Sequence, residues 1–251
     1  MNKIKTTLLS LSATLLFFQS IAQTDTLSKG DSLAYKPKLA VFIPAAVAIT
    51  YGFVALNSDW LRQLDNHIYQ NTNKKHPGFN TPADDYLRYV PVAAVYGLDL
   101  MGIKGKNNFR DKTALFFISS LFTNATVNVL KRSSNRMRPN HYNDYSFPSG
   151  HTATAFAAAE FLHREYGEQS LWISIAGYTV ASTTGVFRLY RNYHWFSDVV
   201  AGAGIGILST KLAYLAYPPI KKMIFGKKQS NFSALPFYQD KAVGLAIAGK
   251  F

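Results

Sequence analysis

The feature that most constrains this fold is a series of long apolar segments with few or no charges. Residues 39–57 carry no charge over 19 residues, about the length needed to cross a bilayer. Residues 113–130 and 171–187 are also uncharged. Three more segments carry one acidic or basic residue each: 89–103 with Asp99, 151–162 with Glu160 and 199–217 with Lys211. The pattern predicts an all-α fold, a six-helix bundle that is largely membrane-embedded, although the segments with Asp99 and Glu160 are marginal as spans.

Composition narrows the class of protein. Only 16% of the 251 residues are charged, against roughly 25% in a typical soluble domain. The 27 Lys and Arg outnumber the 14 Asp and Glu, which gives a net charge of +13. A basic chain with so few charges fits a membrane-associated protein or an anion binder, and nucleic acid is not an expected partner. The lack of cysteine excludes a disulfide scaffold, a Cys-ligated metal site and a thiol nucleophile.

The two ends of the chain differ from its centre. Lys3 and Lys5 precede an apolar run, and Ser20-Ile21-Ala22 offers a cleavage site, so we predict a signal peptide over 1–22. An uncleaved anchor helix is the alternative. A flexible segment, 23–38, then leads to the helical domain, 39–217. Pro218-Pro219 is expected to end the last helix, and a basic, weakly strand-like tail follows over 218–251.

Polar residues capable of chemistry gather in three short clusters between positions 131 and 198. They are Lys131 with Arg138-Pro139, then Pro148-Ser149-Gly150-His151, then Arg188 with His194 and Asp198. Taken alone, each cluster could be a solvated helix end, a turn with a cap, or a surface pair. Their occurrence together in one bundle instead predicts a single site.

The first feature of such a site is fixed positive charge, which suits an anion such as a phosphate monoester with nearly two negative charges. Lys131, Arg138 and Arg188 supply three cations, and arginine adds bidentate geometry. Ser149, Gly150 and His151 stand at a helix start, where free N–H groups and the helix dipole favour an anion. These residues predict phosphate binding with no metal and no other cofactor.

The second feature is a nucleophile. His194 and Asp198 are four residues apart and share one face of a helix, so the carboxylate can accept one ring N–H and leave the other nitrogen free to attack phosphorus. We predict that His194 forms a phosphohistidine, while His151 protonates the departing alcohol and then activates water. Five flanking residues either line the substrate entrance or belong to ordinary loops: His141, Tyr142, Tyr190, Arg191 and Tyr193.

The three clusters resemble the signature of the type-2 phosphatidic acid phosphatase superfamily: Lys-x6-Arg-Pro, Pro-Ser-Gly-His and Ser-Arg-x5-His-x3-Asp. One position departs from it, because Phe187 replaces the serine before Arg188. That superfamily includes bacterial lipid phosphatases, class A acid phosphatases and vanadium haloperoxidases. The resemblance implies the same roles for His194 and His151, and a six-helix core over about 39–217.

The residues and the resemblance predict a hydrolase that acts on a phosphate monoester or diphosphate of a membrane lipid. Phosphatidate, phosphatidylglycerol phosphate, a polyprenyl diphosphate and lipid A all fit, since apolar helices beside the pocket favour a substrate with lipid tails. The alternative is an acid phosphatase with soluble substrates. A vanadium haloperoxidase and a non-enzymatic membrane protein are less well supported.

The distribution of charge between the two ends of the bundle predicts how the protein is oriented in the membrane. All three clusters must lie at one end of the bundle, while Lys104, Lys106, Arg110 and Lys112 lie at the other. The positive-inside rule then places the site outside the cytoplasm, in a cell-envelope protein whose active site faces the periplasm. Six spans after a cleaved signal peptide would give the reverse orientation. A retained signal, partial insertion and a soluble secreted bundle therefore remain open.

Overall fold

The computed structural model describes residues 39–225, 232–239 and 242–249. The predicted signal peptide over 1–22 and the segment 23–38 lie outside the described residues. The chain divides into two units, Met1–Ala213 and Tyr214–Phe251.

The described part of the first unit is helical throughout and contains no strand. Its elements are a short 3-10 helix η1 (Leu39–Phe42), α2 (Ile43–Ala55), α3 (Asp59–Lys75), α4 (Ala83–Leu87), α5 (Val90–Leu100), α6 (Phe109–Ser134), α7 (Gly150–Tyr166), α8 (Leu171–Tyr190) and the first part of α9 (Phe196–Phe225). Each of the six apolar segments forms a helix, which confirms the predicted all-α character for this unit.

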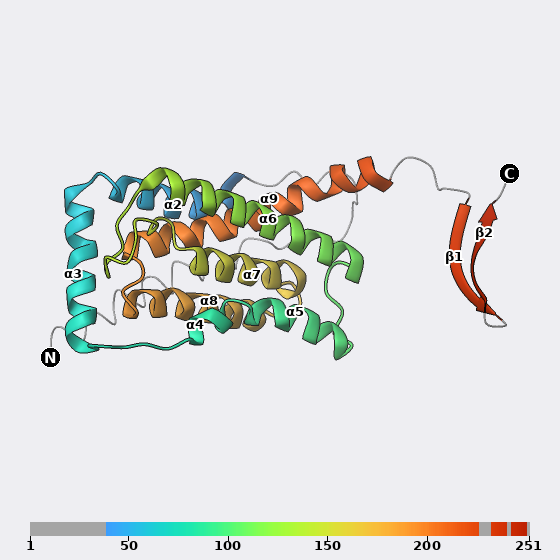
Figure 1. Ribbon diagram of the computed structural model, residues 1–251, viewed down its shortest axis with the longest axis horizontal. Coiled ribbons are helices and arrows are strands. Elements are labelled where there is room, and N and C mark those ends of the chain that lie inside the picture. Colours follow the sequence, from blue (N-terminus) through green and yellow to red (C-terminus); the bar gives the residue numbers. More distant parts are fainter. Residues whose placement is uncertain (1–38, 226–231, 240–241, 250–251) are drawn as a thin grey trace. The chain divides into compact units, whose positions relative to one another are not determined.

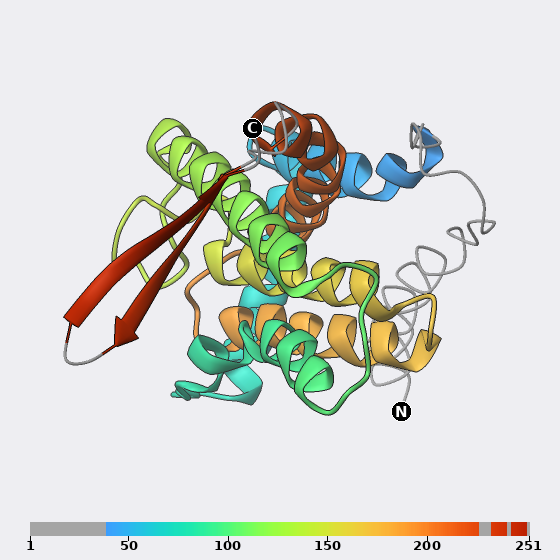
Figure 2. The same ribbon diagram turned by 90° about the vertical axis from the view of Figure 1, so that its right-hand side faces the viewer.

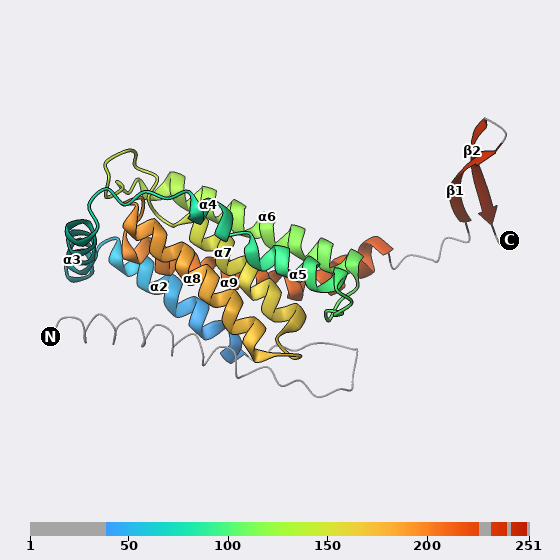
Figure 3. The ribbon, with the colours of Figure 1, turned by 90° about the horizontal axis from the view of Figure 1, so that it is seen from below.

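The described residues contain two α-helices more than the six predicted, α3 and α4. Both lie in the polar stretch between α2 and α5. Helix α3 is bent by 95° from α2 and crosses the end of the bundle (Figures 1 and 3). Within α3 only Leu61 and Asp65 are buried, and this stretch lacks the long apolar run on which the prediction of six helices rests. The six-helix prediction is therefore wrong in number, because it counted only apolar segments and both additional helices are polar.

Helix α7 is the centre of the bundle and is buried over most of its length. It contacts α5, α6 and α8, and Figure 2 shows these helices obliquely. Helix α9 also approaches it closely through small residues: a Cβ at Gly202 would lie 2.5 Å from the carbonyl oxygen of Ser149. Only glycine allows this approach, and it sets the start of α9 beside the start of α7.

Two described helices are long and apolar enough to cross a membrane, α6 and residues 196–223 of α9, or three if the bent pair α2–α3 is one span. The outer face of α6 is apolar and exposed at Phe117, Leu121 and Val129. Helix α5 has 11 residues, about 16 Å at 1.5 Å per residue, which is too short to span. The described helices thus provide two or three candidate spans, fewer than the helices of the bundle.

The second unit contains the end of α9 and an antiparallel pair of strands, β1 (Phe232–Gln239) and β2 (Ala242–Gly249), with Phe232 opposite Gly249. Pro218 and Pro219 lie inside α9, so the prediction that they end this helix is wrong. The fixed φ of proline is close to that of a helix, and the helix can continue with the proline hydrogen bonds missing.

Candidate active site

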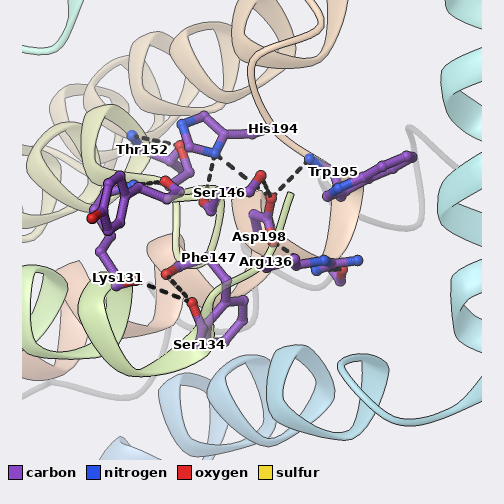
Figure 4. A network of polar contacts seen from close by, with 12 residues as sticks. Lys131, Ser134, Arg136, Ser146, Phe147, Thr152, His194, Trp195 and Asp198 are labelled. Carbon is purple, nitrogen blue, oxygen red and sulfur yellow. Dashed lines mark hydrogen bonds and ion pairs between the residues drawn. The ribbon is translucent and has the colours of Figure 1, made fainter. Parts of the chain in front are cut away.

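The three clusters meet at one end of the bundle, where α6 and α8 end and α7 and α9 begin. Backbone contacts tie them together. The Lys131 ammonium donates to the carbonyl of Tyr145 at 2.6 Å, and the Ser149 N–H donates to the carbonyl of Asp198 at 3.0 Å. The His194 ring donates to the carbonyl of Ser146 at 2.8 Å (Figure 4). The structure therefore brings the residues predicted from the sequence to one place.

The imidazole of His194 is buried just before α9. Its Nδ1–H donates to the Ser146 carbonyl, while the nearer carboxylate oxygen of Asp198 is 3.6 Å from Nδ1. The acceptor that we expected, Asp198, is thus a charged neighbour and not the direct partner. A carbonyl oxygen can only accept, so Nδ1 holds the proton and Nε2 of the neutral ring keeps its lone pair. Burial, the largest cause, lowers the pKa of His194 to about 3, which keeps the ring neutral near pH 7.

The carboxylate of Asp198 is fixed by three donors. They are the Ser146 hydroxyl at 2.5 Å, the Trp195 N–H at 2.9 Å and the Arg136 guanidinium at 2.6 Å (Figure 4). Arg136 also donates to Asp65 of α3 at 2.7 Å. Helix α3 is therefore connected to the carboxylate beside His194.

Sequence reasoning missed both residues of that connection. Arg136 looks like any other cation in the basic loop after α6, and Asp65 lies in the polar stretch between the first two apolar segments. The two are 71 positions apart, and no local spacing links them.

Three arginines form a cationic cradle, which we define as Arg138, Arg188 and Arg191. Their guanidinium carbons lie 5.7, 4.3 and 4.7 Å from the centre of the Tyr193 ring, in that order. The Nε–H of each of them is buried and has no hydrogen-bond partner. Buried donors are almost always satisfied, so three such groups in one place indicate a site that takes an anion. The flanking residues Arg191 and Tyr193 thus belong to the site.

The start of α7 provides a second kind of donor. Ser149 is the N-cap, and its hydroxyl contacts that of Thr152 at 2.8 Å. The first N–H groups of a helix, here those of Gly150 and His151, have no partner within the helix and favour an anion. The His151 ring faces α4, where its Nε2 lies 2.6 Å from Asp85. Burial, followed by the charge of Arg188, lowers the pKa of His151 to about 4.

Helix α4 contributes two carboxylates that sequence reasoning also missed. Asp84 is fully buried and accepts from Arg188 at 2.5 Å and from Arg191 at 2.6 Å. Asp84, Asp85 and His151 offer ligand atoms within 4.8 Å of one another, as a metal site would. Both oxygens of Asp84 already accept from guanidinium groups, however, and two fixed cations beside the cluster oppose a third. These residues fit a metal ion poorly.

Comparisons with known proteins come from sequence and from structure. Residues 112–222 match the family model described as the PAP2 superfamily. A lipid A 1-phosphatase of Porphyromonas gingivalis is 43% identical over 152 residues, which cover 60% of this chain and 34% of that protein. One of Rhizobium etli is 31% identical over 122 residues, or 41% and 50% of the two chains. The chain thus spans about a third to a half of the length of these relatives.

Among solved structures, the crystal structure of Aquifex aeolicus LpxE aligns with a TM-score of 0.44 and 22% sequence identity. The alignment covers 58% of this chain and 93% of that one.

Proposed function

Because the chain belongs to the PAP2 superfamily, we propose that it is a phosphatase that removes a phosphate group from a membrane lipid. One observation carries the proposal. The cationic cradle holds three buried Nε–H donors without acceptors, in the same end of the bundle as a buried imidazole whose Nε2 keeps its lone pair. A phosphate group would satisfy the donors, and its phosphorus would meet the nucleophile.

The proposed reaction has two steps. In the first, Nε2 of His194 forms a bond to phosphorus, the bond from phosphorus to the leaving oxygen breaks, and His151 gives that oxygen a proton. In the second, His151 takes a proton from water, whose oxygen displaces His194 and releases inorganic phosphate. Lys131 and the cradle balance the charge of the transferred group throughout. The reaction uses no metal, and we expect chelators to leave kcat/KM unchanged.

The substrate class is supported by the surface around the site. A small depression between α5, α6 and α7 is lined by Tyr89 and Phe116 and by several Ser, Thr and Asn side chains. Thr154 of this lining is one helical turn from Gly150, to whose carbonyl it donates. The exposed apolar side chains of Phe117, Leu121 and Val129 on α6 would contact lipid tails while the phosphate lies near the start of α7. Both relatives described above are lipid A 1-phosphatases, so a phosphate of lipid A is the first substrate to test.

The test is phosphate release by the purified full chain in detergent micelles. Lipid A, phosphatidate, phosphatidylglycerol phosphate and a polyprenyl diphosphate would be compared with p-nitrophenyl phosphate, and His194→Ala would serve as the blank. We expect a higher kcat/KM on at least one lipid than on the soluble ester. Preference for the soluble ester over every lipid would indicate an acid phosphatase instead, and release equal to that of His194→Ala would exclude an enzyme of this kind.

We also propose that the protein lies in the cell envelope with its active site facing the periplasm. Lys104 and Arg110 support this orientation from the end opposite the site. Lys112 and Lys106 add less than the sequence suggests, since they pair with Asp99 and Glu168, each at 2.7 Å.

The chain has no cysteine, so single cysteines can report its orientation. Tyr142, at the site end, is 78% exposed, and Met101, at the other end, is 76% exposed. In spheroplasts, a membrane-impermeant maleimide should label Tyr142→Cys and spare Met101→Cys until the membrane is opened. The opposite pattern would place the site in the cytoplasm.

A further inference from the structure

Helix α4 brings two adjacent acidic side chains to the pocket, and they do different things. Asp84 is fully buried and binds two arginines of the cradle. Asp85 is partly exposed, with 42% of its side chain accessible, and its closest contact is Nε2 of His151 at 2.6 Å. Its other oxygen is 3.5 Å from Arg191. The mechanism proposed above uses His151 but gives no task to Asp85.

The contact between Asp85 and His151 can be compared with that between Asp198 and His194. In both pairs a carboxylate lies at one nitrogen of an imidazole proposed to act on the substrate. The carboxylate oxygen lies 2.6 Å from the ring nitrogen in the Asp85–His151 pair and 3.6 Å in the Asp198–His194 pair. In the second pair the ring N–H donates to the backbone carbonyl of Ser146 instead. A direct carboxylate bond suits a ring that must become positively charged, because it stabilises the imidazolium. A carbonyl suits a ring that must stay neutral in order to attack.

From this geometry we infer that Asp85 is the positioning residue of the acid–base histidine. It holds Nε2 of His151 by a hydrogen bond, orients the ring, and stabilises its protonated form before the proton passes from the ring to the leaving oxygen. The inference rests on the proposed function, since it takes His151 as the proton donor.

The charges around His151 show why its protonated form needs an acidic partner. Burial and the positive charges of Arg188 and Arg88 all oppose protonation of the ring, whereas Asp85 favours it through its hydrogen bond and its charge. The hydrogen bond from His151 lowers the pKa of Asp85 itself, so its carboxylate is ionised near neutral pH. Asp84 is committed to Arg188 and Arg191 and leaves Asp85 as the acidic partner in direct contact with the ring.

The test varies the leaving group, because p-nitrophenolate departs without a proton and an alkoxide does not. Asp85→Asn should lower kcat/KM on an alkyl phosphate lipid by roughly 10- to 100-fold more than on p-nitrophenyl phosphate, within the range of general acid catalysis. Its activity on the lipid should also begin to fall at a lower pH, because the pKa of His151 drops when the carboxylate is removed. Asp85→Glu should restore part of the difference, and Asp59→Asn, an exposed charge removal on α3, should leave both substrates unaffected.

Equal losses on the two substrates would reduce Asp85 to a structural role, and a gain on the lipid would show that it obstructs the pocket; either result overturns the inference. A wild-type protein that releases no phosphate from either ester would count against the proposed function instead. The pKa of His151, measured by NMR on the full chain in micelles, decides the inference in that case, since it must fall in Asp85→Asn and would stay unchanged if the contact had no influence.

Discussion

Buried charges in the interior of this bundle and those of the cradle differ in how completely they are paired. In the interior, the Glu160 carboxylate accepts from Lys211 at 3.1 Å, from Arg164 at 3.0 Å and from Tyr178 at 2.5 Å. At the site end, the three arginines of the cradle each keep a buried Nε–H without an acceptor. Both groups cost desolvation energy. The comparison teaches that paired charges hold the helices together, whereas leftover donors mark the place where a ligand completes the set.

The largest expected effect is the loss of chemistry at the site end. His194→Ala removes the nucleophile and should lower kcat by at least about 10³-fold, since a covalent mechanism has no substitute for it. Binding of vanadate, which mimics the transferred phosphoryl group, should persist because the cradle is intact. Steady-state kinetics and equilibrium binding of vanadate measure the two effects. Substantial turnover by this variant would reject the assignment of His194.

The interior group should show the opposite profile. Lys211→Gln removes one partner of a buried carboxylate and should lower the free energy of unfolding by roughly 3 kcal/mol, while kcat/KM of the folded protein stays near that of the wild type. Chemical denaturation in micelles gives the first quantity. A variant that keeps its stability but loses activity would break the distinction between the two groups.

Arg138→Gln tests the same distinction, between paired interior charges and the cradle, at the site end. No ion pair of Arg138 is present among the described residues, so its removal leaves no carboxylate without a partner. We expect kcat/KM to fall by roughly 10²-fold, as for the loss of one charge-stabilising group, with little change in the unfolding midpoint. If stability fell as far as in Lys211→Gln, the cradle would have to be regarded as structural.

The smallest expected effect, counted per unit of pH, is on the dependence of stability on pH. The pKa of His194 is lowered from 6.5 to about 3, so the unfolded chain takes up a proton below pH 6.5 that the folded protein refuses. This contribution is fully present above pH 6.5 and is lost by about 1.4 kcal/mol per pH unit on acidification towards pH 3. His194→Asn should therefore lose stability less steeply than the wild type between pH 6.5 and 4.5. Parallel curves would show that the ring is not held neutral.

The sequence predicts those parts of the fold that have a local pattern. Apolar segments such as 113–130 and 171–187 form helices because a long run that avoids charge has few other ways to satisfy its backbone. The clusters around Lys131, His151 and His194 meet because each stands at a helix terminus that lies at the same end of the bundle. The catalytic roles of these residues stay predictions.

The missed parts have no local pattern. Asp84 meets Arg188 across 104 positions, and it does so on a five-residue helix too short to have a recognisable period. The acceptor for His194 is a backbone carbonyl, that of Ser146, which no side-chain motif can specify. The number of spans could not be read from apolar character alone, because it does not report helix length, as the short helix α5 shows.

The most direct test of the central claim is to trap the enzyme during turnover. The wild-type protein would be mixed with its preferred phosphate ester, quenched at alkaline pH, where phosphohistidine survives, and digested for mass spectrometry. The proposed mechanism predicts one phosphoryl group on the peptide that contains His194, and none on the same peptide when His194→Ala is treated identically. Rapid phosphate release by the wild type with no phosphorylated His194 at any time point would contradict it.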